Sequence, residues 1–241
     1  MKELLVTLVV FSFWNCGCAN RVYRTSCLRV DPKTTVKTAV KTFQVYGMDE
    51  RERSIFQSAI SQLEPEVQKS VKTAVVLSAI DDYFQHGTGM SPGHCHPKTG
   101  DICQKRDYDD PMIIWWHEAT HAWRARLPSS ANDEWEKIAG PVYVNSYGRD
   151  RTTEPDYPKD AILREHGSSN HDEDMAIYME AIYAYVYLDI NKFSGVDWKD
   201  KRYIQKIRFL YKWGGISKGT LQAVLTLPIQ AGFDAGFDIK D

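Results

Sequence analysis

The stretch MIIWWHEATHAWRARL, residues 112 to 127, carries the strongest structural signal in the chain. Its apolar residues fall on almost every side of a helix, which predicts that this helix is buried in the core. Asp109 or Asp110 can cap its start, and Pro111 suits the first turn, where a missing N–H costs nothing. Pro128 then ends it, so we expect a single buried helix over the quoted residues.

Within this helix His117, Glu118 and His121 form the pattern H-E-x-x-H. Residues four apart share one face of a helix, so the two imidazoles can grip one zinc ion. Glu118 lies just off that face, where it can take a proton from a zinc-activated water as hydroxide attacks a carbonyl. The alternative is an ordinary core helix with two tolerated histidines, but buried polar groups need partners and a metal supplies them. The pattern therefore predicts one Zn2+ ion, with Glu118 as the general base.

The third zinc ligand has to come from elsewhere, because a catalytic zinc normally has three protein ligands and one open position. Arg124 and Leu127 stand where an extended H-E-x-x-H-x-x-G-x-x-H pattern needs Gly and His, which excludes that layout. A later helical stretch, NHDEDMAIYMEAIYAYVYL, begins with Glu173 and Asp174, and Glu180 follows two turns on. Taken alone, its acidic start is explained by the helix dipole. The unfilled zinc position favours a ligand there.

Three segments together, HEATHAW, EWEKIAGPVYVNSYG and EDMAIYMEAIYAY, resemble the gluzincin class of zinc metallopeptidases over roughly residues 50 to 192. The likeness is closest to bacterial secreted or envelope members with an E-D-x-A helix, which are distantly similar to the catalytic domain of anthrax lethal factor. The resemblance implies a zincin-like fold and hydrolysis of peptide bonds. It also implies that Glu173 is the third metal ligand.

A tyrosine in the S-Y-G turn between the two helices commonly lies beside the metal in such families, and Tyr147 matches it. The resemblance implies that Tyr147 donates a hydrogen bond to the oxyanion of the tetrahedral intermediate. His171 is an alternative for this role. The other interpretation of His171, and of the nearby His166, is a lone loop histidine that is simply solvated.

One position departs from the family pattern. Relatives often carry a second Glu four residues after the ligand, whereas this chain has Ile177. The partner that orients a zinc-bound histidine is then either missing or replaced, and Asp174 and Glu180 are the candidates for the replacement.

Composition limits the classes of partner. The chain has 241 residues, 43% of them hydrophobic and 12% aromatic, which suffices for a packed core. Its 30 basic residues against 32 acidic ones give a net charge of −2, which argues against a nucleic-acid or anionic-membrane surface. We expect a peptide or protein substrate. The alternatives are a catalytically weak zincin-like envelope protein with a binding or assembly role, and a structural protein without metal.

The first residues indicate export. Lys2 precedes an apolar run from Leu4 to Trp14, which is too short to span a bilayer but fits a signal peptide over residues 1–19. Lipidation at Cys16 or Cys18 is an alternative reading of the same segment. The expected location is secreted, periplasmic or, as a lipoprotein, in the outer envelope.

Export affects how the cysteines are interpreted, because disulfides persist outside the cytoplasm. In an oxidising compartment Cys95 and Cys103 are close enough in sequence to form a disulfide, which leaves Cys27 over. The alternative is a second metal site formed by both cysteines with His94 and His96.

Periodicity elsewhere predicts a single α+β domain over residues 20–241, zincin-like, with a small mixed sheet. A capping-box relation between Asp133 and Glu136 marks another helix start. The segment GDICQKR is expected as an edge strand that receives peptide by β-augmentation. Residues 149 to 170 are expected as a specificity loop. The remaining expected elements are helices over 49–64, 172–192 and 197–213 and a buried strand over 71–80.

Overall fold

A five-stranded mixed sheet forms one side of the structure, with the strand order β1-β2-β3-β5-β4. The computed structural model describes residues 34–77, 92–143 and 157–233. β2, β3 and β5 run parallel, and β1 and β4 lie antiparallel at the two edges. The strands are β1 (Thr34–Lys37), β2 (Thr42–Tyr46), β3 (Thr73–Leu77), β4 (Gly93–His96) and β5 (Asp101–Lys105).

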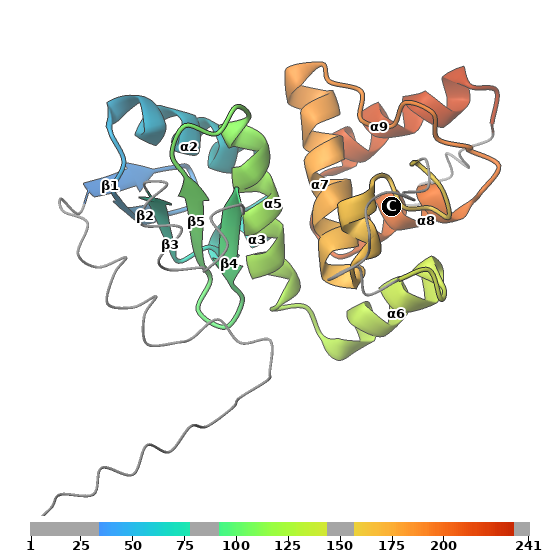
Figure 1. Cartoon of the computed structure of the whole chain (residues 1–241), viewed down its shortest axis with the longest axis horizontal. Helices are drawn as coiled ribbons and strands as arrows, with labels where there is room; N and C mark the ends of the chain where they lie inside the picture. Colours follow the sequence, from blue (N-terminus) through green and yellow to red (C-terminus); the bar gives the residue numbers. More distant parts are fainter. Residues whose placement is uncertain (1–33, 78–91, 144–156, 234–241) are drawn as a thin grey trace, which may run out of the picture.

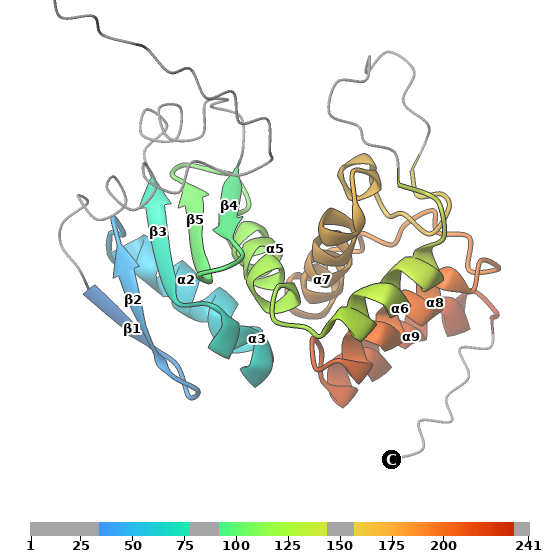
Figure 2. The ribbon, with the colours of Figure 1, turned by 90° about the horizontal axis from the view of Figure 1, so that it is seen from below.

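Helices α5 and α7 lie side by side between the sheet and a group formed by α6, α8 and α9 (Figures 1 and 2). α2, α3 and α5 cover one face of the sheet. The sequence prediction of a single α+β domain with a small mixed sheet is therefore confirmed. The helices are α2 (Glu50–Gln62), α3 (Pro65–Ser70), α5 (Pro111–Arg124), α6 (Ser129–Ala139), η2 (Glu165–Ser168, a 3-10 helix), α7 (His171–Leu188), α8 (Arg202–Lys212) and α9 (Lys218–Gln230).

Side chains alternate between the two faces of the sheet, and this alternation decides whether Cys95 and Cys103 can form a disulfide or a metal site. Cys95 pairs with Ile102, and both belong to the main core under the helices. Cys103 pairs with His94 and packs in a small cluster on the opposite face. The expected disulfide is wrong, because two thiols on opposite faces of a sheet cannot meet. The same alternation separates Cys95 from His94 and His96, so these side chains do not form one metal site.

The position of the edge strand also differs from the sequence prediction. The segment GDICQKR contains β5, which pairs with β3 on one side and β4 on the other. The edge beside α5 is therefore β4, from Gly93 to His96. The apolar residues of a short strand do not show which neighbours it pairs with.

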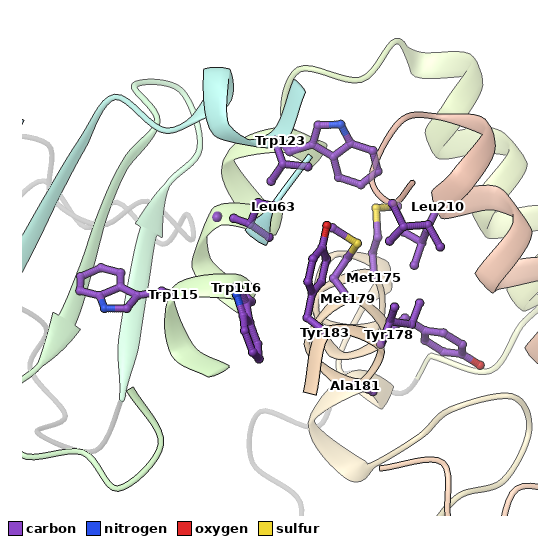
Figure 3. Close-up of a cluster of buried hydrophobic side chains, with 14 of the residues drawn as sticks. Leu63, Trp115, Trp116, Trp123, Met175, Tyr178, Met179, Ala181, Tyr183 and Leu210 are labelled. Carbon is purple, nitrogen blue, oxygen red and sulfur yellow. The ribbon is translucent and has the colours of Figure 1, made fainter. Parts of the chain in front are cut away.

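Adjacent tryptophans on α5 join the two halves of the fold. Trp115 points toward the sheet, where its ring contacts Phe56 edge-on, and Trp116 points toward α7 (Figure 3). The Trp116 ring lies 5.7 Å from that of Tyr183, and its Nε1 donates to the carbonyl of Ala59. Both faces of α5 are thus buried, which explains why its sequence is apolar all round.

The helix starts show where local sequence signals were sufficient and where they failed. α7 begins after Asn170, whose side chain accepts from the backbone N–H groups of Asp172 and Glu173. α6 starts at Ser129, after Pro128, so the predicted start at Asp133 is wrong. α2, β3, α5, α7 and α8 confirm the type of the predicted elements, whereas α3 and α9 were not foreseen.

Several predictions lie outside the described residues. They concern the leader with Cys16 and Cys18, the leftover Cys27, Tyr147 and residues 149–156 of the expected specificity loop; its remaining residues, 157–170, are described and include η2. Within the described part of the chain, no helix is both long and apolar enough to cross a membrane.

Candidate metal centre

The three predicted ligands converge between α5 and α7. The Nε2 atoms of His117 and His121 lie 3.1 Å apart, one turn from each other on α5. Glu173, in the first turn of α7, places its Oε2 atom 3.1 Å from the Nε2 of His117 and 3.5 Å from that of His121. The cap at Asn170 fixes the start of α7 and with it the position of Glu173.

The spacing of these atoms fits a single zinc ion. Ligand atoms at about 2.0–2.2 Å from zinc in a tetrahedron lie about 3.3–3.6 Å from one another. The three observed separations, 3.1, 3.1 and 3.5 Å, are close to that range. Two imidazoles and one carboxylate are also a donor set that zinc accepts. The residues present therefore fit a zinc ion.

Glu180 supplies the partner that Ile177 cannot. It lies two turns after Glu173 on α7, fully buried, and its Oε2 is 3.0 Å from the Nδ1 of His117. Arg164 donates to the same oxygen at 2.9 Å, and Lys192 lies 3.5 Å from the other. Of the two candidates from the sequence, the structure places Glu180 against His117. A carboxylate on the second nitrogen fixes the tautomer and orientation of a metal-binding imidazole.

Asp174, the other candidate, points into a different network. It is fully buried and accepts from Lys206 at 2.6 Å and from the hydroxyl of Tyr143 at 2.8 Å. Burial raises the pKa of Asp174, and burial lowers the pKa of Lys206. This network ties α7 to α8 directly beside Glu173.

The electrostatics of the centre follow from burial and hydrogen bonding. Burial alone would lower the pKa of His117, but hydrogen bonds with Glu173 and Glu180 raise it to about 10. Burial alone would raise the pKa of Glu173, but hydrogen bonds from the surrounding histidines hold it far below its ordinary value. The metal-free centre therefore holds an imidazolium at His117 beside ionised carboxylates.

Glu118 lies on the sheet side of the site, against β4. A side chain on Gly93 would start 2.7 Å from the Oε1 of Glu118, so this carboxyl group occupies the space that the glycine leaves. Burial raises the pKa of Glu118, and the nearby charges of His117 and His121 oppose that shift. A carboxylate with a raised pKa suits proton transfer near neutral pH.

His166 is the site residue that the sequence did not reveal. It lies on η2, and its Nε2 is 2.8 Å from the Oε2 of Glu173. Its ring stacks on that of His117 at 5.8 Å. The only feature of the sequence that points to His166 is its position seven residues before Glu173. This separation is short enough for the connection between them to bring both residues to the candidate centre.

His171 belongs to another cluster. Its ring meets Arg124, Asp172 and the carboxylate of Glu136 near the start of α7. The ligand atoms of His117, His166 and Glu173 also lie within 4.8 Å of one another, so His166 belongs to the candidate centre and His171 does not.

The fold and the site thus define an α+β protein with a histidine–glutamate centre between two buried helices. Comparisons of the chain with protein-family models, curated proteins and solved structures find no match.

Proposed function

We propose that the protein is a zinc-dependent peptidase of the gluzincin type, with a zincin-like fold. The observation that supports this most is the approach of Glu173 to both histidines of the HEATH helix, from a helix more than fifty residues away. Two imidazoles and an acid buried together need a positive charge among them, and a zinc ion can supply that charge in place of a proton. His117, His121 and Glu173 would hold one Zn2+ ion.

Each residue then has a chemical task. Bound zinc lowers the pKa of a water towards neutrality and polarises a carbonyl. Glu118 accepts the proton of the attacking water at its carboxylate and passes it to the leaving amine. Glu180 holds the ring of His117 through Nδ1, so that Nε2 points to the other ligands. Tyr147 remains the proposed donor to the oxyanion.

A leader over residues 1–19 would export the protein, and its substrate would be a peptide or protein met outside the cytoplasm. The rival proposal keeps the zinc but not the turnover, as expected of a zincin-like envelope protein with a binding role.

The two proposals separate in one set of measurements. Metal analysis of the purified protein should give one zinc per chain, lost in His117→Ala. Glu118→Gln should keep the zinc and lose hydrolysis of a peptide library, because the amide cannot take the proton. Glu66→Gln, in an exposed pair with Lys69, is the matched control and should change neither. Stoichiometric zinc with no hydrolysis by the native protein would favour the binding role, and absence of zinc would reject both.

A further inference from the structure

His166 stands on the open side of the candidate centre. Its side chain is 53% exposed, whereas those of His117 and Glu180 are almost fully buried. It nevertheless points inward, with Nε2 at 2.8 Å from the Oε2 of Glu173. This is the same carboxylate oxygen that faces His117 and His121. Three imidazole nitrogens therefore surround one oxygen atom.

The backbone around His166 is tied to the centre a second time. Arg164, two residues earlier, donates to Glu180 at 2.9 Å, and Glu180 in turn contacts the Nδ1 of His117. Gly167 donates its backbone N–H to the carbonyl of Arg164, which closes the short helix η2. The segment 164–166 thus contacts Glu173 and Glu180, the two carboxylates of α7 that hydrogen-bond to His117.

An ordinary surface ion pair does not account for this arrangement. Exposed pairs contribute little to stability, and they do not require that the nitrogen contact a carboxylate oxygen that already faces two other imidazoles. The His166 ring stacks on His117 at 27°, and the ligand atoms of His117, His166 and Glu173 lie within 4.8 Å of one another. A shift of His166 by about one bond length would place its nitrogen at the spacing of a fourth zinc ligand.

We propose that His166 is a fourth protein ligand, which closes the zinc site when no substrate is bound. This inference rests on the proposed zinc centre. Four protein ligands make a closed site, whereas hydrolysis needs one open position. His166 is half-exposed and lies on a single 3-10 turn, so it is the ligand that a substrate carbonyl can displace. His117, His121 and Glu173 then remain as the three protein ligands.

X-ray absorption spectroscopy of the zinc-loaded full chain tests this, because it counts imidazoles in the first coordination shell. The native protein should show three imidazoles and His166→Ala two, with an additional oxygen ligand. The zinc affinity of His166→Ala, measured by chelator competition, should fall by about 100-fold or more. Loss of a residue that only hydrogen-bonds to a zinc ligand typically lowers affinity by about 10- to 100-fold. His166→Gln repeats the test with a larger side chain. His171→Ala is the control, and it should keep three imidazoles and native affinity.

Hydrolysis gives the second readout. Removal of a displaceable ligand leaves kcat at high zinc equal to or above the native value. Two imidazoles in the native protein, with an unchanged spectrum in His166→Ala, would overturn the assignment. A large loss of kcat in that variant would instead identify His166 as a donor to the transition state. Absence of stoichiometric zinc in the native protein would overturn the whole centre, which is a distinguishable result.

Discussion

Replacement of Lys206 by methionine tests how the fold supports the candidate centre. The ammonium of Lys206 is fully buried and bonds to Asp174 at 2.6 Å and to the carbonyl of Ala161 at 2.7 Å. It also lies 5.4 and 5.1 Å from the rings of Trp135 and Tyr178. Methionine matches the length of the lysine stem but supplies no charge.

The expected loss is large because the partner stays behind. In Lys206→Met, Asp174 keeps the donors of Tyr143 and Trp135, at 2.8 and 3.2 Å, but no cation. Removal of one member of a buried ion pair costs about 3–5 kcal/mol of unfolding free energy. At about 2–4 °C per kcal/mol for a domain of this size, the melting temperature should fall by about 6–20 °C.

Circular dichroism during thermal and urea unfolding measures this loss of unfolding free energy. Its dependence on pH provides a second test. Without Lys206, burial raises the pKa of Asp174 above its unfolded value, so the folded variant binds a proton more tightly than the unfolded chain. The difference from the native protein should therefore shrink as the pH falls from 7 to about 4. The double variant Asp174→Asn, Lys206→Met leaves no lone charge and should recover most of the loss. A loss below about 1 kcal/mol, or a difference that does not change with pH, would refute the reasoning.

Four further outcomes are expected. In Gly93→Ala the new carbon would stand 2.5 Å from the Cγ2 of Ile114 and 2.7 Å from the Oε1 of Glu118, so both side chains have to move; kcat should fall by about 100-fold with zinc retained, and native kcat would contradict this. Glu180→Gln should weaken zinc affinity by about 10- to 100-fold in chelator competition, and an unchanged affinity would show that Glu180 does not orient His117. Because the pKa of His117 is about 10 without metal, zinc uptake at pH 7.5 should release its proton, and calorimetry in two buffers with different ionisation enthalpies can measure that release. For the same reason, the stability that His117 adds to the metal-free protein is present below about pH 6.5 and is lost as the pH rises through 10. Peptide mapping of the unreduced protein should find no link between Cys95 and Cys103, and a cross-linked peptide would disprove the strand assignment.

The parts of the site that were predictable are those with a local pattern. His117, Glu118 and His121 follow from the spacing of one helix, and the acidic start of α7 points to Glu173. Glu180 was a candidate because a residue two turns after Glu173 shares its face. The choice between Glu180 and Asp174 needed the structure, because Asp174 turns to Lys206, more than thirty residues away.

The parts that were missed depend on pairings between distant segments. The face on which Cys103 lies follows from its register with His94, and the edge position of β4 follows from the whole strand order. His166 comes from a connection with no helical or strand period. Its role follows only from its distance to Glu173, so composition and spacing alone indicated a solvated residue.

Charge balance connects these observations. Glu118, Glu173 and Glu180 bring three carboxylates to one buried region, while Arg164 and Lys192 both serve Glu180. Burial alone would lower the pKa of His117, but hydrogen bonds with Glu173 and Glu180 raise it to about 10, so without metal an imidazolium supplies the remaining positive charge. A divalent cation can replace that proton, and the Nε2 atom it needs already faces Glu173 and His121. The metal-free centre is thus held together by the carboxylates and imidazoles that would bind zinc, so metal uptake requires loss of a proton more than a rearrangement of the fold.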